Sequence, residues 1–221
     1  MTAPRVAVID YGIGNLRSAE KALQLAGADA FLTADPGLID RADAVVLPGV
    51  GAMARCMQAL ESTGLLGPAM DAVQSGRPFL GVCVGMQMLH LGSTEHGGVE
   101  GLGVFPGTVR LIQPATDGTR PLKVPHMQWN RLTAVAPSRL LDGTDVAGDC
   151  WVYFVHSFAA DSHADVVATA DYGGPVTALV ERDNVMGTQF HPEKSGVHGI
   201  ALLRSFVALC RTSPGVTSYA R

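Results

Sequence analysis

The chain has 221 residues, of which 47% are hydrophobic and 16% are charged, and its formal net charge is −4. This composition excludes an intrinsically disordered chain, and the negative charge without a run of Lys or Arg argues against binding to nucleic acid or to an anionic membrane surface. A chain of this length can bury a substantial core, so we expect a single domain over residues 1–221.

The uncharged stretches and the cysteines indicate a cytoplasmic protein. The longest uncharged stretch, from Pro78 to Thr94, is shorter than the ~20 apolar residues that cross a bilayer. The N-terminal residues lack the pattern of a signal peptide. The cysteines form no CxxC pair and stand far apart, at Cys56, Cys83, Cys150 and Cys210. This spacing indicates neither a zinc site nor a disulfide framework, so we expect reduced thiols and no bound metal.

The first half of the sequence alternates short apolar runs with segments of helical periodicity. Strands are expected at Val6–Asp10, Ala30–Thr33, Ala44–Leu47 and Pro78–Val82. Helices are expected at Leu16–Ala26, Ala52–Leu60, Leu66–Ser75 and Val84–Leu91. Continuous apolar strands that alternate with helices favour a parallel sheet covered on both faces.

The second half contains short strand-like segments separated by Gly, Pro and Asp turns. We expect strands at Gly103–Ile112, Pro121–Val124, Trp151–Val155, Val166–Asp171, Val176–Glu181 and Val185–Phe190. A last helix is expected at Val197–Leu209. The predicted fold class is therefore α/β, a single domain with a mixed, mostly parallel central sheet and helices on both faces.

Cys83 is the first candidate for chemistry, because it lies between an apolar strand and a helix in the sequence Gly81-Val-Cys-Val-Gly85. A nucleophile at such a sharp strand-to-helix turn needs small neighbours, and the helix N-terminus favours a thiolate. A buried structural cysteine is the alternative, since cysteine is among the most buried residue types. The turn by itself leaves both interpretations open.

A base and an orienting carboxylate for such a thiol occur late in the chain, in Gln189-Phe-His191-Pro-Glu193. Pro192 stiffens the connection, so Glu193 could hold the imidazole in one tautomer while His191 faces the thiol. The turn Pro48–Gly51 follows a predicted strand, where backbone N–H groups could face a developing oxyanion. Together these segments favour a cysteine nucleophile more strongly than any of them alone.

Several motifs together resemble the class I (triad) glutamine amidotransferases. The sequence Gly81-Val-Cys-Val-Gly-Met-Gln87 and the sequence His191-Pro-Glu193 carry this resemblance. Further segments resemble the glutaminase subunits of imidazole glycerol phosphate synthases, and these are Asp10–Ser18, Pro48–Gly51, Pro125–Asn130, Tyr153–Ser157 and Gln189–Ser195. The resemblance implies a flavodoxin-like α/β fold. Gln128 departs from the pattern, because the family usually has glycine there.

The resemblance also implies a role for each matching residue. It makes Cys83 the nucleophile, His191 the general base and acid, and Glu193 the carboxylate that orients the imidazole. Backbone at Val50, Gly51 and Val84 would form the oxyanion hole. The residues that would hold glutamine are Gln87, Glu95, His156, Ser157 and Phe158. The surface toward a partner protein would include Asn15, Trp129 and Lys194.

The activity implied by the resemblance is hydrolysis of glutamine to glutamate and ammonia, without a metal or an organic cofactor. The ammonia would pass to a (β/α)₈ cyclase subunit in a heterodimer. The cyclase would use it with a phosphoribulosyl-formimino nucleotide to make imidazole glycerol phosphate and aminoimidazole carboxamide ribonucleotide in histidine biosynthesis. Two alternatives are the glutaminase of another triad amidotransferase, such as pyridoxal phosphate synthase, and a non-catalytic binding module on the same fold.

Overall fold

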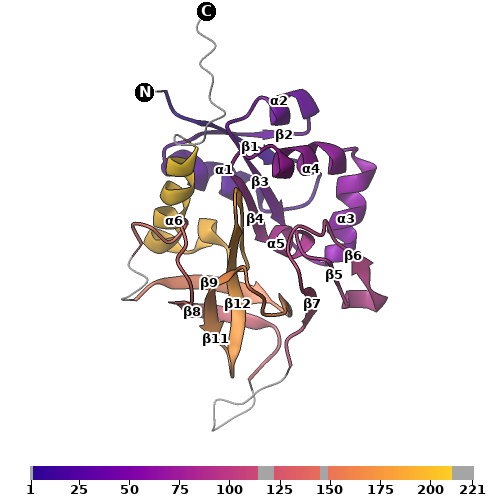
Figure 1. The fold of residues 1–221 in the computed structure, drawn as a ribbon, viewed down its shortest axis with the longest axis vertical. Coiled ribbons are helices and arrows are strands. Elements are labelled where there is room, and N and C mark those ends of the chain that lie inside the picture. Colours follow the sequence, from indigo (N-terminus) through magenta and orange to yellow (C-terminus); the bar gives the residue numbers. More distant parts are fainter. Residues whose placement is uncertain (1, 114–121, 145–148, 211–221) are drawn as a thin grey trace, which may run out of the picture.

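The fold is described from a computed structural model, which covers residues 2–113, 122–144 and 149–210. Within these residues the largest element is a nine-stranded sheet (Figure 1). Its strands, in spatial order, are β2 (Asp29–Thr33), β1 (Arg5–Ile9), β3 (Ala44–Gly49), β4 (Phe79–Cys83), β13 (Val185–Thr188), β12 (Pro175–Arg182), β11 (Val166–Asp171), β8 (His126–Ala134) and β9 (Trp151–His156).

The large sheet is mixed, which confirms the predicted α/β class. Neighbouring strands from β2 to β13 are parallel, and those from β13 to β9 are antiparallel. The parallel part is therefore smaller than the sequence predicts. The reason is the short connections in the second half, because a tight turn such as that between Asp171 and Pro175 can only join antiparallel neighbours.

A smaller four-stranded sheet lies beside the end of the large one. Its strands, in spatial order, are β10 (Phe158–Ala160), β7 (Thr108–Leu111), β5 (Gly92–Ser93) and β6 (Val99–Glu100). The 3₁₀ helix η1 (Glu95–Gly97) connects β5 to β6. This sheet therefore brings the predicted glutamine-binding residues Glu95 and Phe158 to one side of the molecule.

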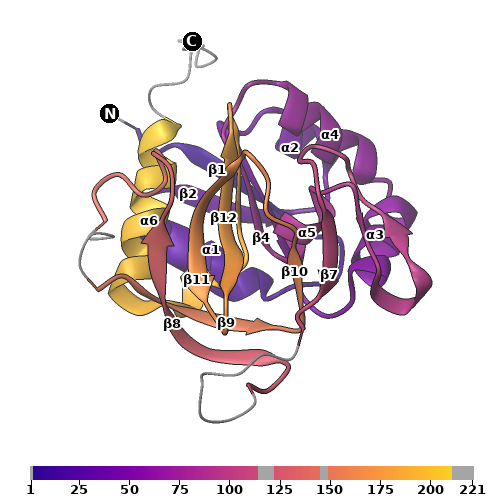
Figure 2. The ribbon, with the colours of Figure 1, turned by 60° about the horizontal axis from the view of Figure 1, so that its bottom comes forward.

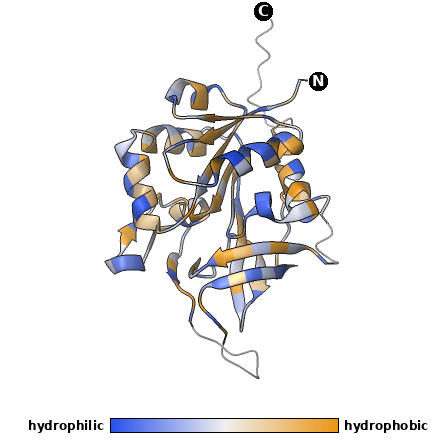
Figure 3. Cartoon of the chain, turned by 180° about the vertical axis from the view of Figure 1, so that it is seen from behind, coloured by the Kyte–Doolittle hydropathy of each residue, from blue (hydrophilic) through white to orange (hydrophobic). Residues whose placement is uncertain are grey.

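Helices cover both faces of the large sheet, as predicted (Figure 2). On one face α1 (Leu16–Leu25) contacts α6 (Gly196–Leu209), which follows the 3₁₀ helix η2 (Pro192–Lys194). The other face carries α2 (Pro36–Asp40), α3 (Met53–Ser62), α4 (Leu66–Gln74) and α5 (Val84–Met88). Apolar residues are concentrated in the central strands, whereas the helices are divided between polar and apolar residues (Figure 3). Among the described residues, no helix is both long and apolar enough to cross a membrane.

The strand predicted at Pro121–Val124 is wrong where it can be examined. Residue 121 lies outside the described residues, and residues 122–124 form no strand. The strand begins instead at His126 and extends to Ala134. Its apolar residues Met127 and Trp129 face outward and are exposed, whereas His126 is buried. This inversion of the usual pattern explains why hydrophobic periodicity does not detect β8.

Several other elements differ in length from the prediction. The helix expected at Val84–Leu91 ends at Met88, because the chain turns there to enter the smaller sheet. The strand expected at Gly103–Ile112 is confined to Thr108–Leu111. Helix α2 was not predicted because it has only five residues; it begins at Pro36, and the Asp35 side chain accepts a hydrogen bond from the Gly37 N–H.

Gln128 occupies an ordinary strand position in β8, paired with Phe154 of β9. Among the described non-glycine residues, left-handed backbone occurs at Cys83, His96 and Asp183 and not at Gln128. The backbone here therefore does not require the glycine that is usual in the family.

The strands β3 and β4 end beside each other, with Gly49 paired to Cys83. In parallel sheets this carboxyl edge is where ligands bind, so the turn after β3 and the turn after β4 are placed at one site. Gly85 makes this arrangement possible. A Cβ at Gly85 would clash with the Leu47 carbonyl oxygen.

We expect Gly85→Ala to lower the free energy of unfolding by about 3 kcal/mol or more, because neither backbone segment can move away. Gly67→Ala in α4 is a matched control, since a Cβ there meets nothing within 4 Å and alanine favours a helix by up to about 1 kcal/mol. Urea denaturation measures both. Equal midpoints for the two variants would contradict the close approach.

Candidate active site

Cys83 lies in a strained strand-to-helix turn. It is the last residue of β4 and the residue before α5, with φ 56° and ψ −111°. Such a φ is unfavourable for any residue with a side chain, and strain of this kind persists only where the surroundings enforce it. Gly81 helps to enforce it, since a Cβ there would lie 2.8 Å from the Gly85 carbonyl oxygen. The sequence prediction of a nucleophile elbow therefore agrees with the backbone geometry.

His191 and Glu193 form a buried pair next to this turn. His191 follows β13 and precedes η2, which contains Glu193. The His191 Nδ1 lies 2.7 Å from the Glu193 Oε1, and each side chain is 3% exposed. Because the carboxylate occupies Nδ1, the other ring nitrogen is left for the Cys83 thiol, which also hydrogen-bonds the imidazole. The structure thus brings the three predicted triad residues together.

The protonation of His191 is decided by competing effects. Burial lowers its pKa, but hydrogen bonds to Cys83 and Glu193 and the charges of these two groups outweigh burial and raise the pKa to about 9. The imidazole is therefore protonated at neutral pH, and an imidazolium beside a cysteine favours its thiolate.

Asn15 contacts the triad carboxylate from the start of α1. Its Nδ2 donates to the Glu193 Oε1 at 3.4 Å, although the two residues are 178 positions apart. The other carboxylate oxygen, Oε2, is buried and has no hydrogen-bond partner among the described residues. The resemblance implied that Asn15 faces a partner protein, and this contact places it directly behind the triad.

The turn after β3 is held from behind by two side chains that the sequence did not single out. The Tyr11 hydroxyl donates to the Pro48 carbonyl at 2.6 Å, and the Cys56 thiol donates to the Val50 carbonyl at 3.3 Å. Burial raises the pKa of both groups, so both keep their protons as donors. Gly51 has a φ of +80°, a conformation that glycine adopts without strain.

The predicted site residues surround one cavity of about 370 Å³. Its lining includes Cys83 and His191, all three predicted oxyanion residues and all five predicted glutamine-binding residues, and its members are Val50, Gly51, Cys83, Val84, Gln87, Glu95, Pro125, Val155, His156, Ser157, Phe158 and His191. This volume suits a small polar molecule. The predicted partner-facing residues Asn15, Trp129 and Lys194 lie outside this lining.

The side chains of Gln87 and Glu95 are fixed by hydrogen bonds at the cavity wall. Gln87 Nε2 donates at 3.0 Å both to the Phe158 carbonyl and to the Gln189 Oε1. Glu95 Oε2 accepts from the Met53 N–H at 2.9 Å, at the first residue of α3. Gln189 belongs to a motif of the sequence, but no role was predicted for it.

His156 is held by a chain of hydrogen bonds that prevents it from acting as a base. Its Nδ1 donates to the Phe158 carbonyl at 2.9 Å, so its Nε2 accepts from the His126 Nδ1 at 3.0 Å. His126 in turn accepts from Asn130 Nδ2 at 3.3 Å. Burial lowers the pKa of His156 to about 4, and the nearby His191 contributes to this shift. Among these histidines, His191 is therefore the one suited to proton transfer.

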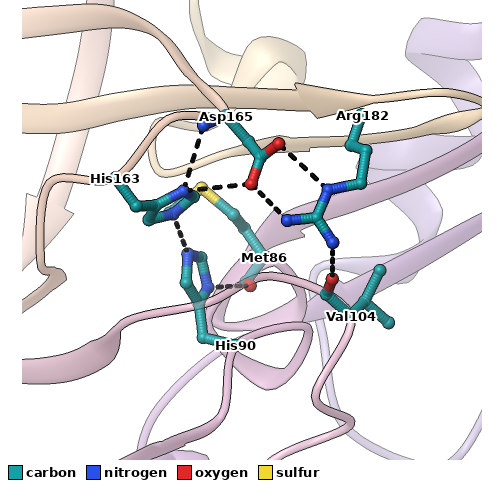
Figure 4. Close-up of polar contacts among 6 residues, drawn as sticks. All are labelled: Met86, His90, Val104, His163, Asp165 and Arg182. Carbon is teal, nitrogen blue, oxygen red and sulfur yellow. Dashed lines mark hydrogen bonds and ion pairs between the residues drawn. The ribbon is translucent and has the colours of Figure 1, made fainter.

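A second polar network supports α5 on the side away from the cavity (Figure 4). The His90 Nδ1 donates to the Met86 carbonyl at 3.0 Å, and its Nε2 lies 3.2 Å from the His163 Nε2. His163 pairs with Asp165 at 3.3 Å, and Arg182 pairs with the same carboxylate at 2.5 Å. The network connects the helix after Cys83 to the surface of β12.

Comparisons with known proteins agree with this geometry. A family model described as glutamine amidotransferase class-I matches residues 7–210. Two solved structures share the fold with a TM-score of 0.70 each: a putative GMP synthase component from Thermoplasma acidophilum, at 18% identity with 96% of both chains covered, and PurLQS from Thermotoga maritima, at 19% identity with 94% of this chain and 99% of that chain covered. Fold and site together define a class-I glutamine amidotransferase.

Closer relatives are proteins named imidazole glycerol phosphate synthase subunit HisH. The protein from Methanothermobacter thermautotrophicus is 48% identical over 207 residues, covering 93% of this chain and 99% of the relative. The protein from Caulobacter vibrioides is 50% identical over 211 residues, covering 91% and 97%. The chain therefore belongs to the HisH family of class-I glutamine amidotransferases.

The network of Figure 4 generates a test of pH-dependent stability. Burial lowers the pKa of His90 to about 4, below its value of about 6.5 in the unfolded chain. The unfolded state therefore binds more protons below pH 6.5, and the free energy of unfolding should fall as the pH is lowered from 6.5 to 4. His90 contributes up to about 1.4 kcal/mol per pH unit to this slope.

His90→Gln should make the slope shallower by about one proton over this pH range. His96→Gln is the matched control, because its imidazole is 76% exposed and loses little water on folding. Urea denaturation between pH 4 and pH 7.5 measures the slopes. Equal slopes for the wild type and His90→Gln would show that burial does not keep this histidine neutral.

Proposed function

We propose that this chain is the glutaminase subunit of an imidazole glycerol phosphate synthase and that Cys83, His191 and Glu193 are its catalytic residues. The observation that carries the proposal is the placement of this buried trio at one cavity with the residues predicted to hold glutamine. The names of relatives that are 48% and 50% identical over most of the chain support the histidine-biosynthesis role. We also propose the cytoplasm as its location, because a cysteine nucleophile has to stay reduced.

In the proposed reaction the Cys83 thiolate attacks the carbon of the glutamine side-chain amide. The resulting oxyanion is stabilised by N–H groups at Gly51 and Val84. The His191 imidazolium gives its proton to the departing nitrogen, and ammonia leaves a glutamyl thioester on Cys83. The imidazole then takes a proton from water, which attacks the thioester, and glutamate and the thiolate are released. Glu193 keeps the imidazole oriented throughout.

The hydrogen bonds of Gln87 define what it can offer to the substrate. Its amide nitrogen is committed to the Phe158 carbonyl and to Gln189, so its carbonyl oxygen remains as an acceptor. An acceptor suits the α-ammonium group of glutamine. Glu95 keeps its Oε1 available at the same cavity, because its Oε2 is bound to the Met53 N–H.

We propose that the cyclase partner, a (β/α)₈ barrel, docks on the outward face of β8 and β9 to form a heterodimer. Met127 is 61% exposed, Trp129 48% and Trp151 43%, which is unusual for side chains of this size. The strand register places Trp129 beside Tyr153 and Met127 beside Val155 on this face. Val155 also lines the cavity, so the face continues to the candidate active site.

Lys194 is exposed near the same face and next to the triad carboxylate in sequence. Asn15 contacts that carboxylate directly. A partner that binds these residues could therefore bias the position of Glu193 and couple docking to glutamine hydrolysis.

We expect Cys83→Ala to lower glutamine hydrolysis by more than about a thousandfold, as loss of a triad nucleophile usually does. The assembled complex should still make its product from ammonium salts, because the cyclase site is intact. Glutamate formation and cyclase product are the two measurements. Cys210→Ala, a buried cysteine on the far end of α6, is the control and should keep its activity. Retained glutaminase activity in Cys83→Ala would refute the assignment.

Trp129→Ala should lower the glutaminase activity of the complex in the presence of the cyclase nucleotide, by about tenfold if Trp129 is a central contact of the interface. Ammonia-dependent cyclase activity should not change, because that site lies in the partner. Val135→Ala removes an exposed apolar side chain just beyond the same strand and should have no effect. Unchanged stimulation in Trp129→Ala, with one glutamate formed per product, would remove this face from the proposed interface.

A further inference from the structure

Gln189 lies fully buried beside the sulfur of Cys83. It follows β13 directly and precedes His191 by two residues, and its backbone N–H donates to the Ala178 carbonyl at 2.9 Å. Its side-chain Nε2 is 3.8 Å from the Cys83 Sγ, and its Oε1 is 3.0 Å from the Gln87 Nε2. Both ends of the amide are therefore engaged inside the site.

The orientation of the Gln189 amide follows from the groups around it. The Phe158 carbonyl can only accept, so the Gln87 atom 3.0 Å away has to be the amide nitrogen. The second hydrogen of that nitrogen points to Gln189, whose nearest atom must then be the carbonyl oxygen. This leaves the Gln189 NH₂ group facing the sulfur. The reverse orientation would place two donors against each other and an oxygen against the thiolate.

A donor at this position would stabilise negative charge on the sulfur. Hydrogen bonds to charged groups are about twice as strong as neutral ones, and few competing water molecules reach a cysteine that is 4% exposed. His191 also supports the thiolate, but it gives up and regains a proton during the proposed reaction. The Gln189 amide does not titrate, so its hydrogen bond is available at every stage.

We propose that Gln189 is a fourth catalytic residue, which donates a side-chain hydrogen bond to the Cys83 thiolate and is oriented for this by Gln87. The proposal rests on the proposed function, since it gives Gln189 a role only if Cys83 is the nucleophile. It assigns a task to a buried amide that the triad leaves unexplained. It also makes the contact between Gln87 and Gln189 part of the catalytic arrangement.

Two size-matched variants separate a donor role from a purely structural one. Gln189→Leu removes both ends of the amide. Gln189→Glu keeps an oxygen that can accept from the Gln87 Nε2 but places an acceptor carboxylate against the sulfur. A donor role predicts that Gln189→Glu is at least as impaired as Gln189→Leu. A role limited to holding Gln87 predicts that Gln189→Glu resembles the wild type and that Gln189→Leu raises the KM for glutamine.

The measurement is the rate of Cys83 alkylation by iodoacetamide as a function of pH, followed by mass spectrometry of the peptide that contains Cys83. We expect both variants to react about tenfold more slowly than the wild type at pH 7, with the midpoint of the profile about one pH unit higher. In the complex, kcat for glutamine should fall by a similar factor while KM changes little. Wild-type alkylation of Gln189→Glu would overturn the proposal, as would an unchanged midpoint in both variants.

Thr188→Val is the matched control for damage to this part of the sheet. Thr188 is 1% exposed and its hydroxyl donates to the Phe190 carbonyl at 3.1 Å, so the variant loses a buried hydrogen bond one residue from Gln189. Its alkylation profile should match the wild type. Thermal unfolding shows whether each Gln189 variant is folded, and the Glu variant serves if the Leu variant is not.

Alkylation requires neither glutamine nor a partner, so it tests the contact independently of the proposed function. If the proposed function is wrong, Cys83→Ala retains glutaminase activity while the alkylation profiles still report the bond from Gln189. If the present inference is wrong, the profiles of the Gln189 variants match the wild type while Cys83→Ala remains inactive.

Discussion

The close approach of two backbone segments, the end of β3 and the first turn of α5, is the constraint on which the site depends. No Cβ fits at Gly85 against the Leu47 carbonyl, and one at Gly49 would lie 2.8 Å from the Gly85 nitrogen. This contact holds Cys83 in a backbone conformation that it would not adopt alone. It also brings the Val50–Gly51 turn to the same cavity as the residue after Cys83. Strain at one residue is thus balanced by packing of its neighbours.

Burial acts on every histidine around the cavity, but the partners decide the outcome. Burial lowers the pKa of His126 to about 3 and of His156 to about 4, and neither ring contacts a carboxylate among the described residues. His191 is buried as well, yet its contacts with Cys83 and Glu193 raise its pKa to about 9. The site therefore contains one cationic imidazole among neutral ones. This contrast suits a reaction in which a single group moves protons.

The pair β8 and β9 connects the outer surface to the cavity. Its outward face carries Trp129 and Trp151, whereas its inward face carries His126 and Asn130 in the hydrogen-bond chain to His156. A strand with polar residues inside and aromatic residues outside reverses the pattern of a solvent-exposed sheet edge. The reversal is reasonable if the inside serves a polar site and the outside is covered by a partner protein.

Local patterns in the sequence were enough to predict the α/β class, most of the strands, the turn at Cys83 and the carboxylate partner of His191. These features depend on residues close together in the chain: glycines on either side of Cys83, and two positions between His191 and Glu193. Only the tertiary structure decided that Asn15 contacts Glu193, 178 positions away, and that Gln87 orients Gln189, 102 positions away. Tyr11 and Cys56 likewise gained their roles from strand order. Periodicity describes which face of an element is buried, but which buried side chains meet depends on packing between elements that the local sequence does not specify.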